Sequence, residues 1–219
     1  MAFDAILFDC DGVLVDSEPI TNGVLRDMLE ESGWSLTPAE CVRIFVGKAV
    51  RDERALIEAR TGQPLTEAWM TRFYARRNER LLAELQAIPG AVASVATLHA
   101  NLGGRLACAS GADLAKVLLQ LDMVGLSHYF GRAVFSGHDL PRSKPAPDVY
   151  LAAAAHLAVP PAQCLVVEDT PTGVTAGVAA GATVWAYCPD PAQGGALLAA
   201  GAQRLFADMA LLPALVAEA

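Results

Sequence analysis

Short, uninterrupted runs of apolar residues recur along the chain, and stretches with helical periodicity separate them. Such runs are typical of strands buried on both faces, because a half-exposed strand would alternate between apolar and polar residues. We predict five strands, at Ala5–Phe8, Leu106–Ala109, Ala133–Phe135, Leu165–Val167 and Thr183–Tyr187. Helical segments between strands of this kind are typical of βαβ units. The pattern therefore predicts an α/β fold with a parallel sheet.

Helical patterns follow most of the predicted strands. We predict these helices at Asp113–Leu121, Asp148–Leu157, Thr172–Ala180 and Pro191–Ala200. Asp113 and Asp148 stand where N-caps are expected, because a carboxylate there accepts a hydrogen bond from a backbone N–H of the first turn. Gly181 stands where a C-cap is expected.

The interval from residue 16 to residue 88 has a different pattern. It contains no strand-like run, and its periodicity predicts helices only, at Ile20–Glu31, Pro38–Phe45, Arg51–Arg60 and Thr66–Gln86. We therefore predict a core domain of residues 1–15 and 89–219, with a helical domain of residues 16–88 inserted after the first strand. The insertion follows the carboxyl end of a strand, which is the edge where open α/β sheets bind ligands.

Composition and charge exclude several other classes of protein. The 219 residues carry a net charge of −8, which argues against general binding to nucleic acids or anionic membranes. No apolar run reaches the roughly 18 residues of a membrane span. The first residues include Asp4 and no basic stretch, so we expect a cytoplasmic protein. The five cysteines lack CxxC spacing, and we expect reduced thiols.

Polar side chains with catalytic potential follow the predicted strands. They are Asp9, Asp11, Ser110, which Gly111 follows, Lys144, Glu168 and Asp169. The carboxyl ends of parallel strands share one edge of the sheet, so we expect these residues to converge. Clustered carboxylates suit Mg²⁺, and a lysine beside a hydroxyl suits phosphate oxygens. One carboxylate can act as a nucleophile and a second as an acid and base, which together indicate phosphoryl transfer.

Four of these segments resemble the motifs of the haloacid dehalogenase-like superfamily. The segments are "DCDGVLVDSE", Ser110, "KPAPD" with Lys144, and "VEDTPTGVTAGVAAGA". The position of the insertion resembles the helical-cap subfamily, which includes beta-phosphoglucomutase and phosphogluconate phosphatase. The resemblance covers the whole chain, and it implies a Rossmann-like, doubly wound parallel sheet with a helical cap domain after strand one.

The resemblance also implies roles for the motif residues. Asp9 would be the nucleophile that takes the phosphoryl group, and Asp11 would protonate the leaving oxygen and then activate water. Ser110 and Lys144 would hold the phosphoryl oxygens. Because dehalogenases lack the second aspartate of the first motif, the presence of Asp11 favours phosphoryl transfer.

A Mg²⁺ ion is the cofactor that the resemblance implies. Its ligands would be the Asp9 carboxylate, the backbone carbonyl of Asp11 and Asp169, with Glu168 supporting the site. The substrate would be a small phosphate ester, and a sugar phosphate or phosphosugar acid such as 6-phosphogluconate is favoured over phosphoglycolate-type acids. We expect a monomer without nucleic-acid or membrane partners.

The helical domain should provide contacts to the substrate. The segment "FVGKAVRDE" resembles a glycine-containing cap loop, and Lys48 is the leading candidate for a substrate contact, followed by Arg51. Alternatively, Arg51 pairs with nearby acidic residues on a solvated helix face. Glu18 would contact the substrate or only cap the first helix, and Gly111 is a further candidate beside the phosphate site.

Three other functions remain open at this stage. A phosphosugar mutase would need the cap histidine of beta-phosphoglucomutase-like proteins, and Thr21 stands at that position. A phosphonatase would use a cap lysine, for which Lys48 is available. A non-enzymatic phospho-acceptor module would be about half as long and would lack a cap.

Overall fold

A computed structural model describes residues 3–45 and 48–219. The chain forms two compact units: a core unit that ends at Asp16 and resumes at Gln86, and a helical unit of Ser17–Leu85. The sequence places these boundaries at 15/16 and 88/89. Within the described ranges, we find no helix whose length and apolar character would suffice to cross a membrane.

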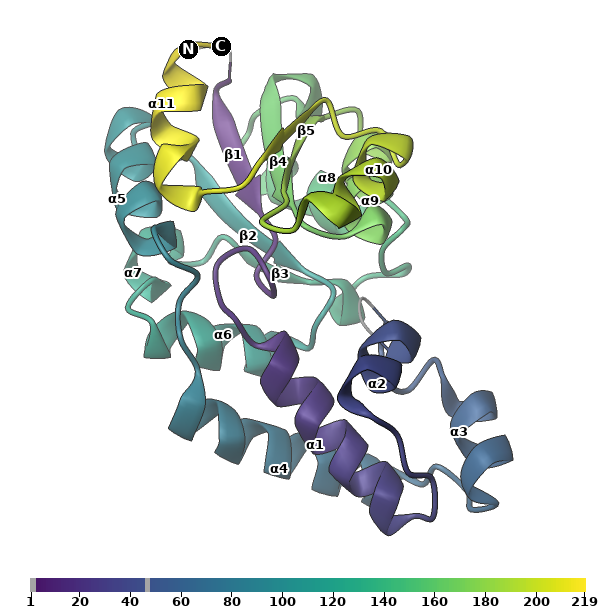
Figure 1. Ribbon diagram of the computed structural model, residues 1–219. Coiled ribbons are helices and arrows are strands. Elements are labelled where there is room, and N and C mark those ends of the chain that lie inside the picture. The colour runs from purple at the N-terminus through teal and green to yellow at the C-terminus, as the bar shows by residue number, and fades with distance from the viewer. Residues whose placement is uncertain (1–2, 46–47) are drawn as a thin grey trace. The chain divides into compact units, whose positions relative to one another are not determined.

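The core unit is built on a six-stranded parallel sheet (Figure 1). Its strands are β1 (Ala5–Phe8), β2 (Leu106–Ser110), β3 (Val134–Ser136), β4 (Cys164–Glu168), β5 (Thr183–Tyr187) and β6 (Arg204–Phe206). The strand order β3-β2-β1-β4-β5-β6 reverses between β1 and β4. This reversal is the switch point at which doubly wound sheets bind ligands. The predicted α/β fold is confirmed.

Helices cover both faces of the sheet (Figure 1). On one side are α5 (Ala91–Asn101), α7 (Ser127–Phe130) and α11 (Leu212–Ala217), and on the other are α8 (Asp148–His156), α9 (Pro171–Ala179) and α10 (Gly194–Ala199). Helix α6 (Leu114–Met123) follows β2. Short 3₁₀ segments lie at η1 (Gly137–Asp139), η2 (Pro161–Gln163), η3 (Pro191–Gln193) and η4 (Met209–Leu211). Leu7 and Val166 of the central strands pack with Tyr150 and Val174 in one buried apolar cluster.

The predicted helix caps have different outcomes. Asp113 caps α6, because its Oδ1 accepts a hydrogen bond from the backbone N–H of Lys116 at 2.9 Å. The prediction for Asp148 is wrong: Pro147 is the N-cap of α8, and the Asp148 carboxylate instead pairs with Arg142 at 2.9 Å. Gly181 follows the end of α9 with φ +82°, a conformation that glycine adopts without strain.

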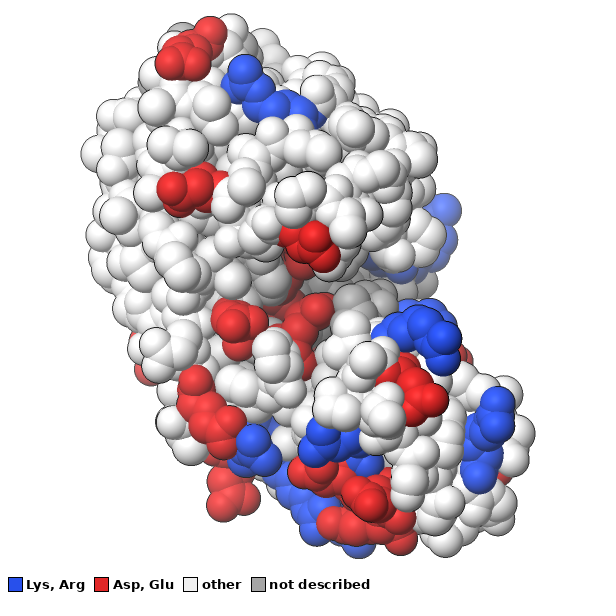
Figure 2. Space-filling view, in the orientation of Figure 1, with Lys and Arg blue, Asp and Glu red and all other residues white. Residues whose placement is uncertain are grey.

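The helical unit has an apolar core of its own. It contains α1 (Glu18–Glu31), α2 (Pro38–Phe45), α3 (Arg54–Thr61) and α4 (Glu67–Glu84). Leu25 and Met28 of α1 pack with Met70 and Phe73 of α4 in one buried cluster. On the face shown in Figure 2, most Lys and Arg side chains lie over this unit, interspersed with Asp and Glu.

The backbone leaves and re-enters the core unit at one place. Val15 and Ala87 form an antiparallel bridge, and the Asp16 N–H donates to the Gln86 carbonyl at 3.0 Å. The Ile88 N–H donates to the carbonyl of Leu14 at the same distance. The two ends of the insertion are therefore tied together by backbone hydrogen bonds of the core.

Candidate active site

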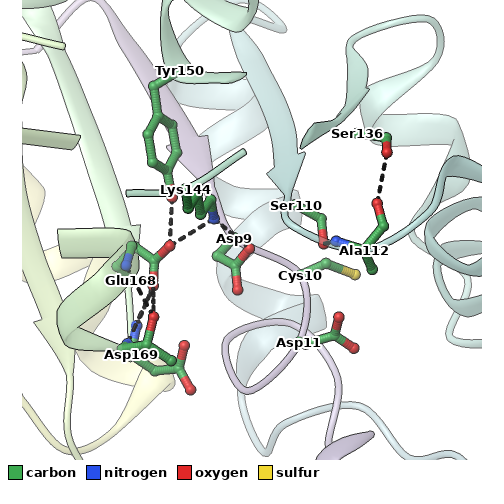
Figure 3. Close-up of polar contacts among 12 residues, drawn as sticks. Asp9, Cys10, Asp11, Ser110, Ala112, Ser136, Lys144, Tyr150, Glu168 and Asp169 are labelled. Carbon is green, nitrogen blue, oxygen red and sulfur yellow. Dashed lines mark hydrogen bonds and ion pairs between the residues drawn. The ribbon is translucent and has the colours of Figure 1, made fainter. Parts of the chain in front are cut away.

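The polar residues expected at the strand ends converge on one edge of the sheet (Figure 3). Asp9 directly follows β1, whereas Ser110 and Glu168 are the last residues of β2 and β4. Phe8 is in register with Cys108 of β2 and Val167 of β4. Asp9 consequently lies at the end of the central strand, between the ends of its two neighbours.

Lys144 joins two of the carboxylates. Its Nζ lies 2.8 Å from Asp9 Oδ1 and 2.7 Å from Glu168 Oε1. The Tyr150 ring lies beneath the ammonium, with 4.8 Å between Nζ and the ring centroid. The Tyr150 hydroxyl donates to Glu168 Oε1 at 2.7 Å. One lysine, whose side chain is 9% exposed, is therefore shared by two buried carboxylates.

The ionisation of these three groups follows from their surroundings. Burial raises the pKa of Asp9 from 3.8 to about 7; Lys144 opposes this increase, and Glu168 and Asp11 add to it. Burial also disfavours charge on Glu168 and on Lys144. For Glu168 the attraction of Lys144 outweighs burial and lowers the pKa. For Lys144 the attraction of Asp9, and after it that of Glu168, outweighs burial and raises the pKa well above its usual value. Lys144 and Glu168 are therefore charged, and Asp9 has surplus negative charge around it.

Glu168 is held by hydrogen bonds at both of its carboxylate oxygens. Oε2 accepts from the backbone N–H groups of Asp169 and Thr170 at 3.0 and 3.2 Å, and from the Thr170 hydroxyl at 3.2 Å. Together with Lys144 and Tyr150 at Oε1, these bonds make five. A carboxylate this fully engaged is suited to orienting Lys144 rather than to binding a metal directly. The sequence did not point to Tyr150 or to the hydroxyl contact of Thr170.

An acidic group beside Asp9 fits a divalent cation. Within the described ranges, Asp9, Glu168 and Asp169 offer carboxylate oxygens that all lie within 4.8 Å of one another. The backbone at Gly12, with φ +79°, runs directly against Asp169: a Cβ at this position would lie 2.0 Å from Asp169 Oδ2. An all-oxygen set of carboxylates is the donor chemistry that Mg²⁺ prefers. Asp9 and Asp169 thus fit that ion as direct ligands, and Glu168, whose oxygens are already engaged, fits a supporting position beside them.

The loop after β2 is fixed by side-chain hydrogen bonds (Figure 3). Ser110 Oγ accepts from the Ala112 N–H at 3.0 Å, and Ser136 Oγ donates to the Ala112 carbonyl at 2.7 Å. Gly111 lies between Ser110 and Ala112 in the chain, and a Cβ at Gly111 would meet no atom within 4 Å. The predicted phosphate-binding hydroxyl therefore stands on a rigid turn with space beside Gly111.

Asp11 has a separate set of partners, which sequence reasoning missed. Its Oδ1 accepts from Lys116 Nζ at 2.7 Å and from Gln120 Nε2 at 2.8 Å. Both donors are buried, at 6% and 0% exposure. The scarcity of lysine, three residues against 13 arginines, was the available signal. It could not place Lys116 without its partner, which lies 105 positions away.

The remaining candidates lie on the helical unit. Lys48 is half-exposed, and its Nζ lies 3.2 Å from Glu53. Arg51 forms two hydrogen bonds with Glu67, at 2.7 and 3.0 Å, instead of pairing with its sequence neighbours. Glu18 is the first residue of α1. Two residues of the expected "FVGKAVRDE" loop, Val46 and Gly47, lie outside the described ranges.

A family model described as haloacid dehalogenase-like hydrolase matches residues 3–181. Among curated proteins, the chain is similar to the 6-phosphogluconate phosphatase of Escherichia coli K12. The two are 32% identical over 86% of this chain and 84% of the relative.

Solved structures resemble the chain over nearly its whole length. A haloacid dehalogenase family hydrolase of Deinococcus radiodurans, solved with bound phosphate and sodium, is 34% identical with a TM-score of 0.79. The match covers 99% of this chain and 96% of that one. A structure described as a putative beta-phosphoglucomutase from Thermotoga maritima is 26% identical. Its TM-score is 0.79, and 98% of each chain is covered.

Proposed function

Because the chain belongs to the haloacid dehalogenase-like hydrolase family, we propose that it is a Mg²⁺-dependent phosphatase of sugar phosphates or phosphosugar acids. The observation that carries the proposal is Lys144, held 2.8 Å from Asp9 and 2.7 Å from Glu168 at the switch point of the sheet. A nucleophilic carboxylate beside a buried cation suits phosphoryl transfer, in which positioning and charge account for most of the catalysis.

In the first step, an oxygen of the Asp9 carboxylate attacks phosphorus. The Asp9–phosphorus bond forms while the ester bond to the leaving oxygen breaks, and Asp11 transfers its proton to that oxygen so that an alcohol departs. Lys144 and the Ser110 hydroxyl hold oxygens of the transferring group. Glu168 keeps the Lys144 ammonium in place beside Asp9.

In the second step, water replaces Asp9 at phosphorus. Asp11, now a carboxylate, takes a proton from the water while the new oxygen–phosphorus bond forms and the bond to Asp9 breaks. Inorganic phosphate leaves, Asp9 is a free carboxylate again, and Asp11 carries the proton for the next cycle. The two aspartates therefore have distinct roles, one covalent and one in proton transfer.

Asp9, Asp169 and the backbone carbonyl of Asp11 would hold the Mg²⁺ ion. When bound, the ion supplies positive charge that stabilises the phosphoryl oxygens and the ionised Asp9. The raised pKa of Asp9, caused first by burial, fits this role, because a nearby cation favours the ionised form of the nucleophile.

The substrate class is supported by the Escherichia coli relative, whose name is 6-phosphogluconate phosphatase. We propose that Lys48 binds a second polar group of the substrate. Arg51 and Glu18 are further candidates for contacts to that group of the substrate. Gly111, which has no side chain, would leave space beside the phosphoryl group. The ion pair between Lys48 and Glu53 would have to open for this contact to form.

The test is a substrate panel assayed with Mg²⁺ for release of inorganic phosphate. The panel contains 6-phosphogluconate, several sugar phosphates, phosphoglycolate and beta-glucose 1-phosphate, with Asp9→Asn as the inactive control. We expect turnover of at least one sugar derivative, loss of turnover with EDTA, and none in the variant. No phosphate release from any compound would refute the proposal. Conversion of beta-glucose 1-phosphate to glucose 6-phosphate would establish a mutase instead.

A further inference from the structure

One oxygen of the Asp11 carboxylate is occupied by two buried donors. Lys116 Nζ and Gln120 Nε2 both donate to Oδ1, at 2.7 and 2.8 Å. The donors are four positions apart on α6, so they project from the same side of that helix, one turn from each other. Neither residue contributes to the contacts described between Asp9, Lys144 and Glu168.

The two donors are themselves fixed in place. The first turn of α6 is capped by Asp113, and Val117 and Leu121 of the same helix are fully buried. The Cys10 thiol donates to Gln120 Oε1 with a sulfur–oxygen distance of 3.6 Å. This contact sets the orientation of the Gln120 amide, because Oε1 faces the thiol and Nε2 faces the carboxylate.

We propose that Lys116 and Gln120 are positioning residues that orient the acid–base carboxyl of Asp11. The inference rests on the proposed function, since it assumes that Asp11 transfers a proton. The two contacts at Oδ1 fix the plane of the carboxyl group and its direction relative to the leaving oxygen.

The arrangement gives each catalytic aspartate its own lysine. Lys144 faces the nucleophile Asp9, and Lys116 faces Asp11. In the first step, the O–H bond of the Asp11 carboxyl breaks as the proton moves to the leaving oxygen. In the second step, the Asp11 carboxylate takes a proton from water. Because Lys116 and Gln120 hold the carboxyl throughout, the side chain does not have to rotate between the steps.

The proposal predicts that the effect of the substitutions on kcat/KM depends on how much the leaving group needs a proton. A 4-nitrophenolate ion leaves without a proton, phenolate benefits from one, and a benzyl alkoxide requires one. We therefore compare kcat/KM for 4-nitrophenyl, phenyl and benzyl phosphate in the wild type and in Lys116→Met and Gln120→Leu. The ratio kcat/KM reports the step in which the ester bond breaks.

General acids contribute about 10²–10⁴-fold, and small errors of placement can cost on the order of 100-fold. For Lys116→Met we expect a loss on the order of 100-fold on benzyl phosphate and about threefold on 4-nitrophenyl phosphate. Gln120→Leu should show the same trend with a smaller difference, because Lys116 still holds Oδ1. Lys116→Arg keeps a charged donor and should recover most of the activity on benzyl phosphate.

Leu118→Gln is the matched control, because Leu118 lies exposed on the same helix. It should leave all three values unchanged. A loss in Lys116→Met that is equal on all three esters would refute the inference and assign Lys116 a structural role only. If Lys116→Met does not fold, Gln120→Leu and Lys116→Arg provide the same comparison.

Failure of the proposed function has a different signature. Unchanged turnover in Asp9→Asn, or no phosphate release by the wild type from any compound of the substrate panel or from the three esters, would remove the phosphatase mechanism and this inference with it. Turnover that requires Asp9 but shows no leaving-group effect in the Lys116 and Gln120 variants would refute only the positioning role.

Discussion

Replacing Asp9, the proposed nucleophile, with asparagine should stabilise the metal-free protein, and the gain should grow as pH rises. Burial raises the pKa of Asp9 from 3.8 to about 7. Between these two values the carboxyl is protonated in the folded protein and ionised in the unfolded chain. Folding therefore takes up a proton, and the free energy of unfolding falls as pH increases. The asparagine side chain of the variant would still accept a hydrogen bond from Lys144 but has no proton to lose.

The size of the effect follows from the width of this window. Each pH unit within it costs the wild type about 1.36 kcal/mol. From about pH 5 to about pH 8, the stability difference between variant and wild type should therefore grow by roughly 2–3 kcal/mol. Glu168 does not obscure the comparison. Its pKa is lowered from 4.5, chiefly by Lys144 acting against burial, so its contribution is lost only as pH falls below this range.

The assay is urea unfolding of both proteins in EDTA at a series of pH values. Leu118→Gln, which exchanges one uncharged side chain for another at an exposed position of α6, is the control and should show a difference independent of pH. A constant or shrinking difference for Asp9→Asn would refute the reasoning. Excess Mg²⁺ should stabilise the wild type more than the variant, because the ion binds the ionised carboxylate.

Three further predictions concern neighbouring features. Gly12→Ala should abolish stabilisation by Mg²⁺ in thermal unfolding, since its Cβ would lie 2.0 Å from Asp169 Oδ2. Tyr150→Phe removes a buried donor from Glu168. It should lower the free energy of unfolding, measured in urea, by about 1–3 kcal/mol. Lys48→Ala should raise KM for the preferred sugar phosphate and leave 4-nitrophenyl phosphate hydrolysis nearly unchanged in steady-state kinetics.

Each of these predictions has a matched control. Gly23→Ala should be tolerated, because a Cβ there meets no atom within 4 Å. Equal effects of the two glycine changes on Mg²⁺ stabilisation would contradict the steric argument. Tyr129→Phe affects a partly exposed ring, and Arg72→Ala an exposed helix position. If Tyr150→Phe is as stable as Tyr129→Phe, the prediction for Tyr150 is contradicted. If Lys48→Ala loses activity equally on both substrates, the prediction for Lys48 is contradicted.

Strands buried on both faces were predictable because their apolar runs record burial directly. The edge strand β6 was missed: it has only three residues and begins with the exposed Arg204. Helix α5 was missed as well. Its buried Ser94 donates to the carbonyl of Met209, a contact that no local pattern reveals. Elements whose burial depends on a partner far away in the sequence are therefore the ones that the sequence does not predict.

The candidate site follows the same rule. Asp9, Ser110 and Glu168 were predictable because each lies at or next to the end of a recognisable strand. The partner of Asp11 was not, since Lys116 Nζ reaches it from 105 positions away. Arg51 illustrates the converse: its acidic neighbours suggested local ion pairs, but the guanidinium bonds to Glu67, the first residue of α4. Spacing along the chain predicts neighbours within an element and not contacts between elements.

The antiparallel bridge between Val15 and Ala87 makes the helical unit interchangeable. Because Asp16 and Gln86 are already hydrogen-bonded to each other, the whole insertion enters and leaves the core as a hairpin loop does. The entropy of closing such a loop rises only slowly with its length, so the core tolerates inserts of very different size. Under the proposed function, exchanging this insertion for another would change the substrate and leave the strand ends at Asp9, Ser110 and Glu168 in place.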